Sequence, residues 1–114
     1  MQATFVETES FAASLPDYLT DEEYCALQQV LLKNPMAGVV IPGTGGFRKL
    51  RWPDSRRGKG KRGGLRVIYY WIDQDKKIWM FGIYDKDEMA DLSTSEKKAL
   101  KNAIESQLKM TRCL

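Results

Sequence analysis

Two apolar, β-prone runs separated by a short polar turn most constrain the fold of this chain. The first is LRVIYYWID, from Leu65 to Asp73, and the second is KIWMFGIY, from Lys77 to Tyr84. Runs rich in branched and aromatic residues are typical of strands, and a polar turn of this length reverses the chain. The pattern therefore predicts an antiparallel hairpin near the centre of a sheet.

Other segments supply further strands and helices around this hairpin. Two more strands are predicted over Ala3 to Glu7 and Phe47 to Trp52, and Val39 to Ile41 is a brief apolar run. Three helices are predicted, over Phe11 to Leu19 with an interruption at Pro16, from Thr20 to Asn34, and from Ser93 to about Leu108. Thr20 with Glu23, and Ser93 with Glu96, have the spacing of a capping box. The predicted order is β-α-α-β-β-β-α.

This element order predicts the α+β class. We expect a curved, mostly antiparallel four-stranded sheet with the helices packed on one face. A chain of 114 residues is long enough for one modest core, so residues 1–114 are predicted to form a single domain.

Composition excludes several classes of function. No apolar run reaches the roughly 20 residues that span a bilayer, and the N-terminus lacks the pattern of a secretory signal. Two distant cysteines suggest no disulfide framework, so a reducing cytoplasm is expected. The chain has no histidine, which removes the usual general base and the commonest metal ligand. We expect no metal, no cofactor and no membrane partner.

Positive charge is concentrated in the middle of the chain. The stretch from Gly43 to Trp71 holds nine of the 18 basic residues and one of the 15 acidic ones. Such a basic segment attracts a polyanion, although it could also be only a solvated surface. Strand alternation would place Lys49 and Arg51 on one face and Arg48 on the other.

One formal nucleotide-binding motif in the chain is rejected, a second is absent, and a metal site is possible but not favoured. The loop GKGKRG, residues 58–63, spells GxGxxG but precedes a strand instead of opening a helix, so it is no dinucleotide site. No P-loop sequence is present. The acids of the connector after the hairpin could bind Mg²⁺, but an ordinary solvated connector is favoured (Asp85, Asp87, Glu88, Asp91).

Taken together, GTGGFRKLRW, the basic glycine-rich loop, GGLRVIYYW and IYDKDEMADLS resemble the RelE superfamily of bacterial toxins, and HigB-type members most. The resemblance covers nearly the whole chain. It implies a small sheet with a basic concave surface and an endoribonuclease that enters the ribosomal A site and cuts translated mRNA. It also implies a cognate antitoxin, which for HigB-type toxins is a helix-turn-helix protein similar to HigA.

The resemblance also assigns roles to individual positions. The paired basic positions fall on Lys49 and Arg51, the recurring arginine falls on Arg66, and the basic residue after the final strand falls on Lys86. Leu92 occupies the place of the tyrosine that some members use in catalysis, so the general base is left open. Arg66 would hold the phosphate and Lys86 would stabilise it or protonate the leaving group.

A lysine in a basic cluster could act as the base, because neighbouring positive charges favour its neutral form. Lys49, Lys59 and Lys61 are the candidates, and Lys49 and Lys61 are taken with Arg66 and Lys86 as the catalytic set. The residues expected to bind RNA are Arg48, Arg51, Arg56, Arg57, Lys59, Arg62 and Tyr84. Two other functions remain open: a non-nuclease toxin similar to ParE that acts on DNA gyrase, and a non-catalytic RNA- or ribosome-binding module.

Overall fold

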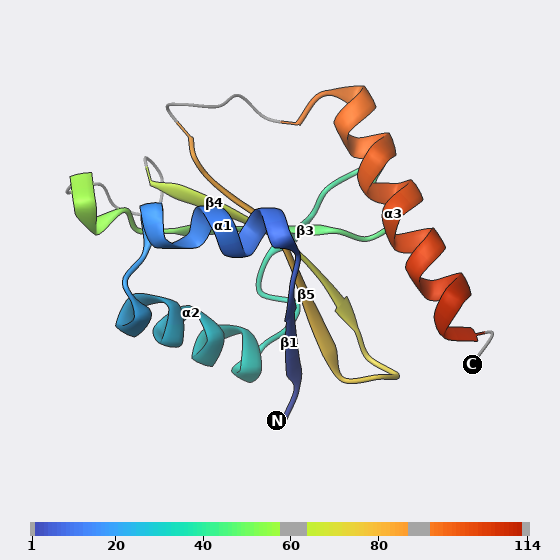
Figure 1. Cartoon of the computed structure of the whole chain (residues 1–114), viewed down its shortest axis with the longest axis horizontal. Coiled ribbons are helices and arrows are strands. Elements are labelled where there is room, and N and C mark those ends of the chain that lie inside the picture. The colour runs from blue at the N-terminus through green and yellow to red at the C-terminus, as the bar shows by residue number, and fades with distance from the viewer. Residues whose placement is uncertain (1, 58–63, 87–91, 113–114) are drawn as a thin grey trace.

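The computed structural model describes residues 2–57, 64–86 and 92–112. It contains one five-stranded sheet of strand order β1-β5-β4-β3-β2. The strands are β1 (Thr4–Glu7), β2 (Val39–Val40), β3 (Arg48–Trp52), β4 (Leu65–Ile72) and β5 (Lys77–Asp85). The helices are α1 (Glu9–Tyr18), α2 (Asp21–Lys33) and α3 (Thr94–Arg112), with a 3₁₀ turn, η1 (Ser55–Arg57), after β3. Figure 1 shows α1 and α2 lying together and α3 standing apart from them.

The predicted hairpin is confirmed as the centre of the sheet. β4 and β5 are antiparallel, with Leu65 opposite Asp85 and Ile72 opposite Lys77. The register shifts by one residue in the middle, so that Ile68 faces Gly82 while Tyr69 faces Met80. Phe81 is therefore an extra residue in β5. A bulge of this kind bends and twists the strand that carries it.

The α+β class is confirmed, but the expected number of strands is corrected. The sheet has five strands instead of four, because Val39 and Val40 pair with Lys49 and Arg48 of β3 to form a two-residue edge strand. A strand this short leaves no periodic signal in the sequence. The sheet is mostly antiparallel, as expected, and β1, which runs parallel to β5, makes it mixed.

The expectation that all helices cover one face is wrong. Buried residues of α1 and α2 pack with Leu65, Val67 and Tyr69 of β4. Residues of α3 pack instead with Ile68. Alternate residues of a strand point to opposite faces, so α3 lies on the other face from α1 and α2. The apolar stripe of α3 suits either face equally well, and the sequence could not choose between them.

The face covered by α1 and α2 carries the larger core. Phe11, Leu27 and Leu31 of the two helices are fully buried there. They meet the alternating residues of the central strands, which are Leu65, Val67, Tyr69, Ile78, Met80 and Ile83. Close packing of apolar side chains on this face supplies most of the hydrophobic stabilisation.

Tyr69 also fixes the segment that leads from α2 into β2. Its hydroxyl donates to the carbonyl of Pro35 at 2.7 Å and accepts from the amide of Gly38 at 2.9 Å. Burial raises the pKa of Tyr69. A Cβ on Gly38 would lie only 2.9 Å from the Tyr69 ring, so glycine is required by this close approach.

The predicted capping boxes are confirmed at the start of α2 and α3. The Thr20 hydroxyl accepts from the amide of Glu23, whose carboxylate accepts from the amide of Thr20. Ser93 and Glu96 make the same reciprocal pair. These bonds satisfy amides that have no partner within the helix. They also lower the pKa of Glu96, through its bonds with the backbone and side chain of Ser93.

The first helix begins earlier than predicted and is continuous through Pro16. Thr8 caps it by accepting from the amide of Phe11 at 3.1 Å. Pro16 lies in the last turns, and the helix pattern continues past it, because the amide of Leu19 donates to the carbonyl of Leu15 at 3.0 Å. The cost of the missing proline donor is therefore confined to one bond near the helix end.

No helix within the described ranges is both long enough and apolar enough to cross a bilayer.

Candidate nucleic-acid interface

Three side chains from three neighbouring strands form a row on the face that α3 covers. Arg51 of β3 lies opposite Arg66 of β4, and Arg66 lies opposite Tyr84 of β5. Residues directly opposite one another in antiparallel strands project from the same face, at Cβ separations of about 5 Å. Lys49 projects from this face too, two residues from Arg51 along β3 and opposite Ile68. The predicted alternation of β3 thus brings four candidate residues together.

Arg66 is the central member of this row, and only 4% of it is exposed. Its Nη1 donates to the carbonyl of Leu65 at 3.1 Å, which helps to hold the guanidinium in place. A guanidinium remains charged when buried and can hold two oxygens of a phosphate at once. Arg51 and Arg66 lie directly opposite each other, so two positive side chains project from the same place on this face.

A cavity of about 210 Å³ opens beside this row. Lys49 and Tyr84 line it from the sheet, and Lys97 lines it from the first turns of α3. Val39 and Val40 form its apolar side and are 74% and 46% exposed. This volume is smaller than the roughly 300–1,000 Å³ of sites for drug-sized ligands, and it suits one small group with a charged and an apolar side.

The sequence did not identify Lys97 as part of this site. It is one of several lysines on a helix whose position over the sheet could not be predicted. The available signal was its place within the apolar stripe: Lys97 precedes Leu100 by three residues and Ile104 by seven. That spacing puts the lysine on the packed face of the helix, where it is half-buried.

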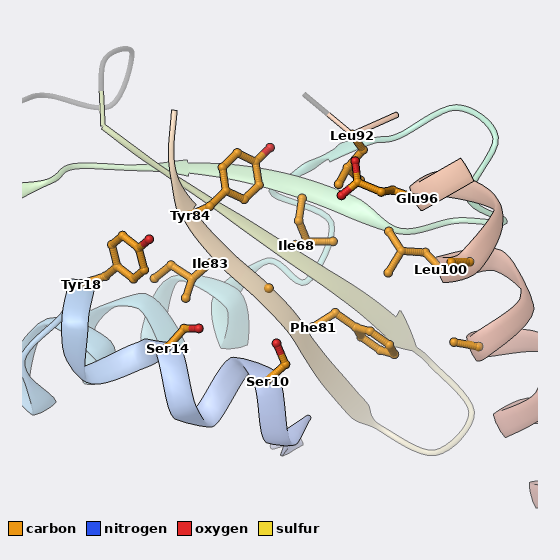
Figure 2. Close-up of a pocket in the computed structure, with 13 residues that line it drawn as sticks. Ser10, Ser14, Tyr18, Ile68, Phe81, Ile83, Tyr84, Leu92, Glu96 and Leu100 are labelled. Carbon is orange, nitrogen blue, oxygen red and sulfur yellow. The ribbon is translucent and has the colours of Figure 1, made fainter. Parts of the chain in front are cut away.

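Tyr84 separates the small cavity from a larger one of about 570 Å³. Figure 2 shows the larger cavity, with Tyr84 and Ile68 on the sheet, Leu100 on α3, and Ser10 and Ser14 on α1. Tyr84 is 6% exposed and belongs to the core beneath α3. It therefore serves both as packing and as a wall shared by the two cavities.

Lys86 lies immediately beyond β5, at the end of the sheet that carries the Arg51–Arg66–Tyr84 row. Its backbone amide donates to the carbonyl of Gly64 at 3.2 Å, which ties it to the start of β4 two residues before Arg66. The residue is exposed. Lys86 and Arg66, to which the resemblance assigns roles in one reaction, thus lie at the same end of the sheet.

Two other predicted RNA contacts are engaged in bonds within the protein. Arg48 projects from the opposite face, opposite Tyr69, and its Nη1 donates to the carbonyl of Gly38 at 2.8 Å. Arg56 holds the buried Asp54 through two bonds of 3.0 Å. Both arginines lie apart from the row, and their bonds join loops to the body of the protein.

Arg56 has further contacts that fasten the segment after β3. Its guanidinium lies 4.7 Å from the centre of the Tyr18 ring, and its Nη2 is 3.8 Å from the carboxylate of Asp85. Next to it, the Ser55 hydroxyl donates to the carboxylate of Glu23. That bond is the main cause of the lowered pKa of Glu23. The base of the basic loop is thereby fixed to α1, α2 and the end of β5.

Several candidates cannot be placed. Lys59, Lys61 and Arg62 lie outside the described residues, and for Arg57 only its backbone, in η1, is described. Of the acidic connector, Asp87, Glu88 and Asp91 also lie outside, while Asp85 is fully buried beside Arg56. Across the part of the chain that is described, no three His, Cys, Asp or Glu residues are grouped to hold a metal ion.

No protein-family model matches the sequence.

Proposed function

We propose that this chain is the toxin of a type II toxin-antitoxin system, a HigB-like enzyme that cuts translated mRNA on the ribosome without a metal ion. The observation that carries the proposal is the arrangement of Lys49, Arg51, Arg66 and Tyr84 on one sheet face. Lys49, Arg51 and Arg66 are positions to which the RelE resemblance assigns a role, and Tyr84 is the aromatic residue that we expect to bind RNA. The resemblance alone predicts residue types, and their convergence on one surface adds a spatial argument.

The proposed reaction cleaves RNA by attack of the ribose 2′-oxygen on the adjacent phosphorus. The 2′-hydroxyl loses its proton, the new P–O2′ bond forms in line, and the P–O5′ bond breaks as the 5′-oxygen gains a proton. Arg66 holds the phosphate oxygens and stabilises the charge of the pentavalent state. Lys86 protonates the leaving oxygen, and Lys49 or Lys61 is the candidate base.

The chain offers no imidazole for either proton transfer. The proposed site therefore stabilises charge well and transfers protons poorly, which accounts for a dependence on the ribosome to align the mRNA. The corresponding partners are the ribosomal A site, the mRNA and a cognate helix-turn-helix antitoxin similar to HigA. The proposed compartment is the cytoplasm, where these partners meet.

The test is expression of the chain in bacteria, followed by mapping of mRNA 5′ ends. Cuts at fixed positions within codons, suppressed by the antitoxin, are the expected result. DNA damage without such cuts would favour the ParE-like alternative, and growth arrest with neither would favour a non-catalytic binding module.

Arg66→Lys tests the assigned centre more directly. It keeps the charge and much of the volume of a buried residue but removes the planar pair of donors, so cleavage should slow by roughly 100-fold or more. Arg48→Lys makes the same chemical change on the opposite face and should cleave at close to the wild-type rate. Both variants must retain the wild-type melting temperature within a few degrees. Wild-type cleavage by Arg66→Lys would remove Arg66 from the reaction.

A further inference from the structure

The turn between β2 and β3 lies against the N-terminal half of α3. Gly43 and Gly45 in this turn have φ angles of 81° and 78°, in the left-handed region that glycine adopts without strain. A Cβ on Gly45 would lie 3.3 Å from Cγ of Lys101, and a Cβ on Gly43 would lie 3.9 Å from Cδ of Lys97. The glycines therefore allow the turn to touch the aliphatic stems of two lysines.

This contact orients the two lysines. A lysine whose methylene stem packs on a surface keeps its ammonium group in water, and it has less rotamer freedom left to lose on binding. Lys97 is half-buried and Lys101 is exposed. The stems of both lysines thus lie at the border between α3 and the glycine turn.

A groove of about 380 Å³ runs along this border. Three lysines line it, Lys97, Lys98 and Lys101, together with Asn102 and one acid, Glu105. Lys97 also lines the 210 Å³ cavity that contains Lys49 and Tyr84. The groove and the cavity therefore share a cation, and positive charge continues from the Lys49 side of the sheet onto α3.

We propose that the groove between α3 and the glycine turn binds the phosphodiester backbone of single-stranded RNA, with Lys97 and Lys101 as its principal contacts. The inference rests on the proposed function, because it extends the path of the same substrate beyond the cavity. A nucleotide at the cavity places its base or its sugar against Val39 and Val40, and the chain continues past Lys97 to Lys101. Successive lysines along one groove match the regular spacing of backbone charges.

The chemistry of the groove favours RNA over an acidic segment of a protein. Protein-binding surfaces have an apolar centre with charges at the rim, whereas this groove is lined by three lysines and one glutamate, with an asparagine, a threonine and a glycine. Its apolar neighbour is the small cavity, which fits one base or sugar and not a row of side chains. The groove thus provides a cationic surface for the RNA backbone, and the adjoining cavity provides space for one base or sugar.

The test uses a single-stranded RNA of about twelve nucleotides in which every ribose is 2′-O-methylated, so that no 2′-oxygen can attack. Its affinity is measured by fluorescence anisotropy over a range of salt concentrations. Lys97→Glu with Lys101→Glu should weaken binding at least tenfold at low salt. The slope of log affinity against log salt should decrease by about 1.4, since each phosphate contact to a single strand contributes about 0.7.

The matched control is Lys33→Glu with Lys109→Glu, which makes the same change in net charge at two exposed lysines that line neither the groove nor the small cavity. It should leave the salt slope unchanged. An equal loss in both double variants would overturn the proposal, because net charge alone would then explain binding. Equal competition by a poly-glutamate peptide would also overturn it.

Failure of this inference and failure of the proposed function give different results. If the wild-type chain cuts mRNA on the ribosome but the α3 variant binds the methylated RNA normally, the groove is not part of the path. If the wild-type chain cuts nothing but the α3 variant loses RNA binding selectively, the groove stands and the nuclease proposal falls.

Discussion

The two faces of the sheet are covered in different ways. On one face, α1 and α2 bury Phe11, Leu27 and Leu31 completely. On the other, α3 buries Ile104 but leaves Leu100 and Leu108 only partly covered. On the first face, every inward-pointing residue of β4 from Leu65 to Tyr69 is apolar or aromatic. The second face carries Lys49, Arg51 and Arg66 next to its smaller core.

This difference separates stability from the candidate function. Charged residues cannot be buried in number without loss of hydration, so a face that carries them can hold only a small core. The larger core opposite supplies a rigid support that keeps the charged side chains in position. Substitutions on the first face should therefore change folding, and substitutions on the second should change binding and cleavage.

The largest expected effect is the loss of a buried leucine on the first face. Leu27→Ala should lower the free energy of unfolding by about 3 kcal/mol, because it removes three buried carbons and leaves a cavity. Leu100→Ala, on the partly covered second face, should cost about 1 kcal/mol. Urea denaturation of both variants measures the comparison. Equal losses would mean that the two cores contribute alike.

Neighbouring residues of β3 allow a sharper comparison, because they project from opposite faces. Arg48→Ala should lower the free energy of unfolding by about 1–2 kcal/mol, since it removes the bond to the carbonyl of Gly38. Lys49→Ala should change stability by less than about 0.5 kcal/mol but slow RNA cleavage at least tenfold, equivalent to about 1.4 kcal/mol. Denaturation and cleavage assays on both variants test whether Arg48 affects mainly stability and Lys49 mainly cleavage. The reverse pattern would contradict the assignment of the faces.

A pair of tyrosines gives a smaller contrast. Tyr69→Phe removes the hydroxyl that joins Pro35 and Gly38, and leaves buried groups without this partner, at a cost of about 1 kcal/mol. Tyr70→Phe changes a half-buried residue of the second face, where water can replace a lost contact, and should cost less. Thermal unfolding of the two variants measures the difference, and a larger effect at Tyr70 would show that the second core is the tighter one.

The smallest expected effect is a dependence of stability on pH. The pKa of Glu23 is lowered in the folded protein, mainly by its hydrogen bond from Ser55, so the unfolded chain binds its proton more readily as the pH falls. Its contribution is complete above the unfolded value near 4.5 and is lost as the pH drops through the folded value. Wild type should therefore lose slightly more stability than Glu23→Gln between about pH 5 and pH 3. Parallel pH profiles would show that the bond contributes nothing.

Local features of the fold were predictable because they depend on neighbours in the chain. The hairpin of β4 and β5 follows from two apolar runs around a polar turn, and both capping boxes follow from spacings of three residues. The shared face of Lys49 and Arg51 follows from the period of a strand. These patterns fix which way a side chain points, without information about the rest of the molecule.

The features that were missed depend on contacts between distant segments. Nothing within Thr4–Glu7 indicates that β1 runs parallel to β5, and nothing within Arg48 or Arg56 indicates that a carbonyl or a buried carboxylate will engage them. In the sequence, the basic residues of the central stretch form one continuous basic segment. In the described part of the structure, Lys49, Arg51 and Arg66 share one sheet face, whereas Arg48 and Arg56 make bonds that hold loops in place.

The sequence by itself determined the four longer strands, the starts of α2 and α3 and the alternation of charged and apolar residues, because hydrogen bonding and side-chain direction repeat within each element. Only the tertiary structure decided that α3 crosses the charged face and brings Lys97 and Lys101 against the glycine turn. An amphipathic helix specifies that one side must be covered, but not by which surface. That choice depends on the space left after the larger core has formed.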